Sequence, residues 1–171
     1  MKTIKVQLQL IDGKCINLDL YPDLAPITVE NFLKLVKSNF YENLIFHRVI
    51  NGFMIQGGGL DQNMVEKEAP NTIKGEFSVN GWNKNTTTLS HEPGVVSMAR
   101  TSILDSASSQ FFIVTGDAKF LDGQYASFGK VSDEKSMDIV KGIEKVKTMS
   151  KSYHDDVPID PIIIKTITIL E

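Results

Sequence analysis

The first candidate for chemistry is a charged side chain inside an apolar stretch, FHRVINGFMIQGGG, at residues 46–59. Asn51-Gly52 lies in the middle of this stretch and predicts a β-hairpin, which would bring Arg48 and Gln56 to the same side. A guanidinium held there would be a hydrogen-bond donor against an apolar wall. The alternative is an arginine at the rim of a barrel, with its stem on apolar surface and its head in water. Spacing alone favours this second interpretation.

Histidine, serine and glycine offer other chemistries, but their patterns are weak. His47, His91 and His154 share no helical or strand spacing, so we expect no metal site and a structural role for His47. Ser97, His91 and Asp105 could be combined into a Ser–His–Asp triad, but the GxSxG motif of a nucleophile elbow is absent. The three glycines that close the opening stretch lack the phosphate-loop pattern and indicate backbone geometry instead.

Composition places these side chains in an ordinary globular protein. The chain has 171 residues, and we expect residues 1–171 to form one domain. The net charge of −3 favours neither nucleic acid nor an anionic membrane as a partner. Cys15 is the only cysteine, which excludes an internal disulfide. No apolar run approaches the roughly 18 residues of a membrane span, and the N-terminus lacks a signal-peptide core. We therefore expect a cytoplasmic monomer.

Periodicity predicts the elements that must position the candidate residues. Alternating runs at 4–10 and 16–20, joined at Asp12-Gly13, predict an opening β-hairpin. Amphipathic helices are expected from Pro26 onward and at 133–147. Further strands are expected at 45–50, 53–57, 95–99, 110–115, 126–131 and 162–170, separated by turn-rich stretches at 60–75, 79–94 and 148–161. About eight strands and two helices predict a closed or nearly closed antiparallel barrel capped by the helices, although periodicity does not separate it from a sandwich.

Three later motifs change the interpretation of the opening stretch. They are GVVSMAR at 94–100, SSQFFI at 108–113 and FLDGQYASFGKV at 120–131. Together with FHRVINGFMIQGG they resemble the cyclophilin family of peptidyl-prolyl cis-trans isomerases, over nearly the whole chain and in the family's order. The compact form and the closing VPIDPIIIKTITI look like the bacterial stand-alone type.

This resemblance implies a mainly β fold, a closed eight-stranded antiparallel barrel capped by two α-helices, with a substrate groove on its outer face. It implies isomerisation of Xaa-Pro bonds in peptides and unfolded proteins, with no cofactor and no metal. Motif matching makes Arg48 the catalytic arginine, with Gln56 beside it. The matched proline pocket consists of Phe53, Met54, Phe112 and Leu121. The matched groove and rim positions are Ala99, Arg100, Thr101, Gln110, Phe120 and Tyr125.

The chain departs from many eukaryotic relatives at three groove positions. Phe120 stands where those proteins carry tryptophan, Tyr125 where they carry histidine, and Arg100 where they carry asparagine. Because the indole N–H is a donor that phenylalanine lacks, we expect weakened binding of the inhibitor cyclosporin. Arg100 is expected to add a charge beside the groove. A proline-peptide binding module without turnover, or a folding helper that holds apolar segments, is the alternative function.

Overall fold

The computed structural model describes residues 2–82 and 89–170. Eight strands form one antiparallel sheet in the order β10-β1-β2-β7-β5-β6-β4-β3, and β8 and β9 form a separate two-stranded sheet. The strands are β1 (Ile4–Leu10), β2 (Cys15–Leu20), β3 (Arg48–Ile50), β4 (Met54–Gly57), β5 (Val95–Met98), β6 (Phe111–Val114), β7 (Ser127–Val131), β8 (Thr148–Lys151), β9 (His154–Pro158) and β10 (Ile164–Ile169). The helices are α1 (Pro26–Lys37) and α2 (Glu134–Glu144), with short 3₁₀ turns at η1 (Ser78–Asn80) and η2 (Lys119–Leu121).

The predicted opening hairpin is confirmed as β1 and β2. Val6 lies opposite Leu18, and Leu8 lies opposite Ile16. These four side chains are fully buried, because alternation places every second residue on the core face of the sheet. The turn closes through a hydrogen bond from Leu10 N–H to the Lys14 carbonyl.

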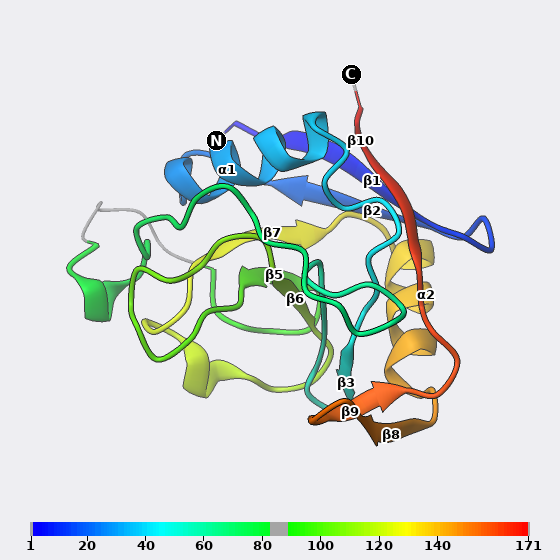
Figure 1. The fold of residues 1–171 in the computed structure, drawn as a ribbon. Coiled ribbons are helices and arrows are strands. Elements are labelled where there is room, and N and C mark those ends of the chain that lie inside the picture. The colour runs from blue at the N-terminus through cyan, green and yellow to red at the C-terminus, as the bar shows by residue number, and fades with distance from the viewer. Residues whose placement is uncertain (1, 83–88, 171) are drawn as a thin grey trace.

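An aromatic cluster ties α1 to the concave face of the sheet. The Phe32 ring of α1 lies 5.2 to 5.6 Å from the rings of Tyr41, Phe111 and Phe128, measured between centroids. Phe111 belongs to β6 and Phe128 to β7, so one side chain of α1 contacts two strands that lie far from the helix in the sequence. In Figure 1, α1 lies at one end of the curled sheet and α2 runs along another side. Neither helix is long and apolar enough to cross a membrane, as judged on the described residues.

The predicted closed barrel is not confirmed, because the sheet is open between β3 and β10. Within the described ranges these two edge strands are joined by no ladder. The gap holds only an isolated bridge between Ile45 and Ile163 and a few backbone hydrogen bonds around it, such as Phe46 N–H to the Ile162 carbonyl. Asn43 has a φ of +66°, which is not a strand conformation, and the pairing of residues 43–46 with 162–164 is limited to this bridge and its hydrogen bonds.

Two further expectations from the sequence need correction. The strand predicted at 45–50 begins only at Arg48, so Phe46 is buried in the core rather than on the face of Arg48. The stretch 148–161, predicted as turn-rich, contains the β8–β9 hairpin, and β9 lies beside β3. Its turn uses Ser152 and Tyr153 at positive φ instead of an Asn-Gly pair, and its strands are mostly exposed and polar, so no periodic signal marks it. Part of the turn-rich stretch predicted at 79–94, residues 83–88, lies outside the described residues.

A buried carboxylate from a distant loop caps the N-terminus of α1. The helix has no side-chain cap of its own, because Ala25 occupies the capping position. Glu76, only 2% exposed, accepts hydrogen bonds from the backbone N–H groups of Ile27 and Thr28 and from the Thr28 hydroxyl. A negative charge at this end also interacts favourably with the helix dipole. Glu76 therefore fixes the loop before η1 to the helix that fills the core.

Replacing Glu76 with alanine leaves these donors unpaired, so we expect Glu76→Ala to lower the free energy of unfolding by about 2–3 kcal/mol. Glu76→Gln keeps acceptor oxygen without the charge and should cost clearly less. Urea denaturation of the three proteins measures both effects. Equal stability of the alanine variant and the unaltered protein would contradict the capping role.

Candidate functional site

The β3–β4 hairpin holds Arg48 and Gln56 directly opposite each other. Their α-carbons are register partners, and Arg48 Nη1 donates to Gln56 Oε1 at 3.3 Å. Gln56 Nε2 in turn donates to Gln110 Oε1 at 3.0 Å. This confirms the expectation that the two side chains project to one side of the hairpin. The guanidinium is exposed and is held by a neutral amide, and no carboxylate of the described chain forms an ion pair with it.

A small pocket of about 130 Å³ opens beside this pair. It is lined by Arg48, Phe53, Met54, Gln56, Ala99, Arg100, Phe112, Leu121 and Tyr125, all of which were picked out in the sequence. A more polar pocket of about 200 Å³ adjoins it and shares Gln56, Ala99 and Arg100 with it. Two more predicted residues, Thr101 and Gln110, line this second pocket. The fold therefore brings together residues from four separate motifs.

The walls of the first pocket are apolar and supported by the sheet. Met54 and Phe112 are buried, and Phe112 lies opposite Gln56 across the β4–β6 pairing. The Tyr125 ring meets the Phe112 ring edge-on at 5.9 Å. Phe120 lines neither pocket, but it is 65% exposed, and its ring lies 5.6 Å from that of Phe53. It forms an aromatic rim above the pocket wall.

Arg100 lines both pockets, where a charge was expected, and its guanidinium is bound to the protein itself. Its Nε and Nη2 donate to the Gln124 carbonyl at 3.0 and 2.7 Å, and its Nη1 donates to the Thr101 carbonyl at 2.9 Å. The guanidinium also lies over the Tyr125 and Phe77 rings, at 4.6 and 5.0 Å. With these contacts Arg100 fastens the loop that carries Tyr125.

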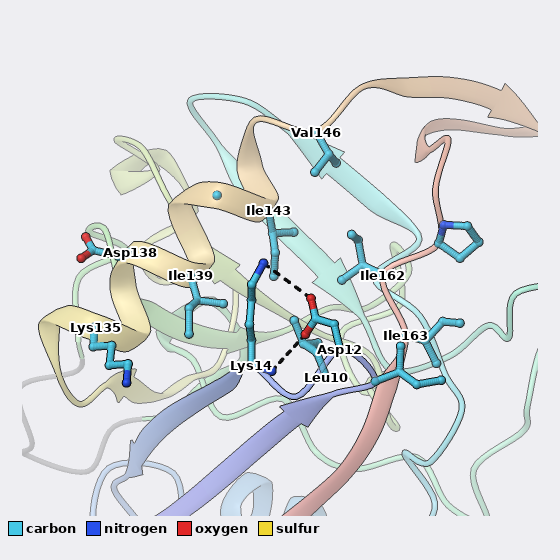
Figure 2. Close-up of a pocket in the computed structure, with 13 residues that line it drawn as sticks. Leu10, Asp12, Lys14, Lys135, Asp138, Ile139, Ile143, Val146, Ile162 and Ile163 are labelled. Carbon is cyan, nitrogen blue, oxygen red and sulfur yellow. Dashed lines mark hydrogen bonds and ion pairs between the residues drawn. The ribbon is translucent and has the colours of Figure 1, made fainter.

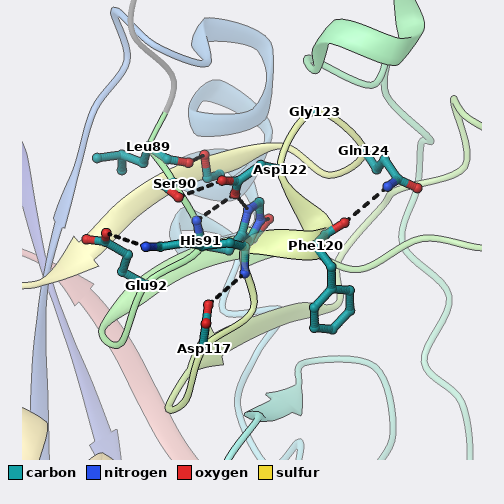
Figure 3. A network of polar contacts seen from close by, with 12 residues as sticks. Leu89, Ser90, His91, Glu92, Asp117, Phe120, Asp122, Gly123 and Gln124 are labelled. Carbon is teal, nitrogen blue, oxygen red and sulfur yellow. Dashed lines mark hydrogen bonds and ion pairs between the residues drawn. The ribbon is translucent and has the colours of Figure 1, made fainter.

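A polar network around the buried His91 (Figure 3) supports the Phe112 wall of the pocket. The Asp122 carboxylate accepts from the His91 backbone N–H, from His91 Nδ1 at 2.7 Å and from the Ser90 hydroxyl. Because Nδ1 donates to a carboxylate, Nε2 is left to accept from the Ser97 hydroxyl at 2.9 Å. The His91 ring stacks on Phe112 at 6.0 Å, and its pKa is lowered by burial against the opposing effect of Asp122.

The Ser–His–Asp arrangement in this network is not a nucleophilic site. Asp122 takes the place considered for Asp105, which instead accepts from Gly75 N–H and the Asn80 amide. Ser97 is completely buried, so no substrate reaches its hydroxyl. The network instead connects the strand residue Phe112 to the η2 turn that carries Leu121.

His47 is buried on the side of the hairpin away from the pocket. It is 4% exposed, and its Nδ1 has no hydrogen-bond partner among the described residues. Burial lowers its pKa to about 4, with smaller contributions from His154 and Arg48. The His154 ring lies 5.9 Å away, a proximity that sequence separation gave no reason to expect. No group of three or more His, Cys, Asp or Glu side chains in the described part of the chain could hold a metal ion.

Sequence reasoning missed three residues of the polar pocket, namely Glu66, Ser106 and Ser108. Glu66 comes from the long stretch 60–75, where no motif gave a guide. Ser106 lies between two motifs, and Ser108 begins the SSQFFI motif but was not singled out.

A larger cavity of about 600 Å³ lies elsewhere, between α2, the β1–β2 turn and residues 161–163 (Figure 2). Its walls are mainly aliphatic, and Asp12 and Lys14 at its edge bind each other. It holds no converging polar groups comparable to Arg48 and Gln56.

Comparisons with known proteins agree with this geometry. A family model described as cyclophilin type peptidyl-prolyl cis-trans isomerase matches residues 4–169. A peptidyl-prolyl cis-trans isomerase of Acinetobacter baylyi is 46% identical over 90% of this chain and 79% of its own. Peptidyl-prolyl cis-trans isomerase B of Escherichia coli is 42% identical over 88% of this chain and 91% of its own. A crystal structure of a cyclophilin type isomerase from Cryptosporidium parvum has a TM-score of 0.77 at 28% identity, and covers 99% of both chains. The same protein was also crystallised in the presence of the dipeptide Ala-Pro, with a TM-score of 0.75 at 29% identity over 98% of this chain and 99% of its own.

The buried His47 predicts a dependence of stability on pH. Its pKa falls from 6.5 to about 4 on folding, so between these values the unfolded chain binds a proton that the folded chain does not. The free energy of unfolding therefore keeps its full value above pH 6.5. It falls by about 3 kcal/mol in total as the pH drops toward 4. His47→Gln should remove this contribution to the slope of the free energy of unfolding against pH, measured by urea denaturation from pH 4 to 7. Identical slopes in the two proteins would contradict the assignment.

Proposed function

Because the chain belongs to the family of cyclophilin-type peptidyl-prolyl cis-trans isomerases and catalyses prolyl isomerisation, we propose that the reaction takes place in the pocket beside Arg48 and Gln56. The observation that carries this proposal is a guanidinium held by a neutral amide at the edge of a small apolar pocket. The family match over residues 4–169 also supports our prediction that residues 1–171 form a single isomerase domain.

The chemistry requires selective binding of a twisted amide. Rotation about a peptide bond meets a barrier of roughly 18–20 kcal/mol because twisting destroys amide resonance, and Xaa-Pro bonds isomerise over tens to hundreds of seconds. No bond to the enzyme forms or breaks during this rotation. A site that binds the twisted state more tightly than the planar states therefore accelerates the reaction.

Arg48 supplies an interaction that only the twisted state can accept. As the amide twists, the prolyl nitrogen becomes pyramidal and gains a lone pair, to which a fixed guanidinium can donate. Arginine stays protonated at all relevant pH values and presents several donors in one plane. Gln56 orients the guanidinium from the opposite strand, and Gln110 orients Gln56. With no carboxylate paired to it in the described chain, the guanidinium keeps donors available for the substrate.

The pocket and its neighbour fit the two parts of a prolyl substrate. Phe53, Met54, Phe112 and Leu121 form the apolar wall for the pyrrolidine ring. The polar pocket, with Thr101 and Gln110, offers hydrogen-bonding groups for the substrate backbone. The Cryptosporidium parvum relative was crystallised in the presence of Ala-Pro, which supports proline-containing peptides as substrates. Unfolded proteins as substrates stay a prediction. Arg100 would contribute to the groove through Tyr125 and the loop it fastens.

Other features of the protein stay predictions. A binding module without turnover would not need the guanidinium that β3 and β4 hold beside the pocket, so the geometry favours the enzyme. The monomeric state and the cytoplasmic location rest on the sequence alone. Weakened cyclosporin binding follows from Phe120, whose ring has no donor for a ligand carbonyl.

Replacing Arg48 tests the proposed role directly. We expect Arg48→Ala to lower kcat/KM for a proline peptide by about 10- to 100-fold, the value of one hydrogen bond to a charged group. Peptide affinity should fall far less, because the planar amide does not use the bond. A protease-coupled assay and a calorimetric titration measure the two quantities. Lys130→Ala, which removes an exposed positive charge from β7, is the control. Equal losses of turnover and affinity would contradict a transition-state role.

The rim residue predicts a gain of inhibitor binding. Phe120→Trp adds an indole N–H at an exposed position, and we expect cyclosporin to bind more tightly by about 3- to 10-fold, the value of one neutral hydrogen bond. Proline-peptide turnover should stay within about twofold, because the aromatic rim is kept. Fluorescence titration of both proteins decides the point. Unchanged cyclosporin affinity would show that the missing donor does not limit binding.

A further inference from the structure

Glu144 is a buried carboxylate that the isomerase chemistry described above does not use. It is the last residue of α2 and is only 8% exposed. An acidic group at the C-terminal end of a helix faces the negative end of the helix dipole, and burial adds a desolvation cost. A group in such an unfavourable place indicates a specific compensating contact.

That contact lies in the turn of the β3–β4 hairpin. Glu144 Oε1 accepts from the backbone N–H of Gly52 at 2.7 Å. The turn is closed by a bond from Phe53 N–H to the Ile50 carbonyl, and Gly52 has a φ of +78° whereas Asn51 has no positive φ. This combination is the pattern of a type II turn. Types I and II differ in the orientation of the central peptide, which here joins Asn51 to Gly52. The N–H of this peptide is the group that donates to Glu144. Glu144 therefore selects one of two accessible turn conformations.

The selected turn sets the position of the pocket wall. Phe53 follows Gly52 directly, and its carbonyl accepts from Thr115 N–H at 2.8 Å and Gly116 N–H at 3.2 Å. The Gly52 carbonyl lies so close to Gly116 that a side chain there would collide with it. The turn is thus held by the backbone that follows β6 on one side and by Glu144 on the other. A flip of the central peptide would move Phe53 first and Arg48, two residues before the turn, less.

The other end of α2 is fixed to the opposite side of the molecule. Asp133 caps the helix by accepting from Ser136 N–H at 2.7 Å. Ser136 Oγ accepts from the backbone N–H of Asn17 in β2 at 2.8 Å. Asp133 also accepts from the Asn17 side-chain amide at 3.0 Å, so the helix connects β2 to the hairpin turn through two side-chain hydrogen bonds at one end and one at the other.

From these contacts we infer that Glu144 is a positioning residue for the isomerase, which holds the Asn51–Gly52 peptide so that Phe53 and Arg48 face the substrate together. This inference rests on the proposed function of the Arg48 pocket. Glu144 does not touch the substrate. Its effect on turnover is transmitted by the backbone of the hairpin turn.

Three variants separate positioning from helix stability. Glu144→Ala removes the acceptor, whereas Glu144→Gln keeps an acceptor oxygen at the same place. Ser136→Ala is the matched control, because it removes one of the two side-chain bonds at the other end of the same helix and does not touch the turn. For each protein, kcat/KM, proline-peptide affinity, the free energy of unfolding and the hydrogen-exchange rate of the Gly52 amide are measured.

We expect Glu144→Ala to lower kcat/KM about tenfold and to expose the Gly52 amide to faster exchange. The kcat/KM of Glu144→Gln should stay within about threefold of that of the unaltered protein. The kcat/KM of Ser136→Ala should stay within about twofold, although this variant is less stable. Faster Gly52 exchange in Glu144→Ala with unchanged kcat/KM would overturn the inference. The inference would also be overturned if kcat/KM fell in the same proportion to the loss of unfolding free energy in Glu144→Ala and in Ser136→Ala.

Failure of the proposed function has a different signature. If Arg48→Ala turned over proline peptides as fast as the unaltered protein, the role of Arg48 would be lost. The positioning by Glu144 would still be decided by Gly52 exchange and by peptide affinity, which depends on the Phe53 wall. Weaker peptide binding in Glu144→Ala, restored in Glu144→Gln, would support it, and unchanged binding in all variants would refute it.

Discussion

The site depends on the pairing of Arg48 with Gln56 across two short strands. β3 has three residues and β4 has four, so a few backbone bonds fix the register. A slip of one residue would place the two side chains on opposite faces of the hairpin, with one of them on the face where Val49 and Ile55 now enter the core. The buried apolar residues between the polar ones therefore hold the guanidinium in place, because they would lose their burial if the register changed.

The side chains that orient the Arg48 guanidinium are neutral, where a carboxylate would have been the simplest partner. Gln56 and Gln110 form a chain of amide hydrogen bonds behind Arg48, which orients the guanidinium without neutralising it. A carboxylate would bind the donors in a charge-assisted pair and compete with a substrate nitrogen. Two carboxylates act one step away from the Arg48 pocket: Asp122 holds His91 behind Phe112, and Glu144 holds the turn before Phe53. Charged groups thus fix the walls, and neutral groups fix the reactive donor.

Much of the fold and of the site could be predicted from residue patterns. The β1–β2 hairpin, both helices and the β3–β4 hairpin follow from alternation, helical periodicity and turn residues, because these signals are local. The sheet's closure could not be predicted, since it depends on how Asn43 and its neighbours meet residues 162–164. The β8–β9 hairpin was missed because its turn contains Ser152 and Tyr153 and its strands bury little apolar surface. The partners of Arg100 could not be predicted either, because they are carbonyls that no sequence pattern identifies.

The sequence by itself determined which residue types are available and the spacing that places Arg48 opposite Gln56. From that spacing alone an arginine at a rim was the simpler interpretation, and only the resemblance of four motifs indicated a catalytic one. The tertiary structure decided what the arginine faces. It brought Phe112, Leu121 and Tyr125 from distant segments to the same pocket, and it placed Glu144 and His91 where they support its walls. The physical reason is that alternation and turns act over a few residues, whereas the pocket is formed by contacts between segments that only the packed core brings together.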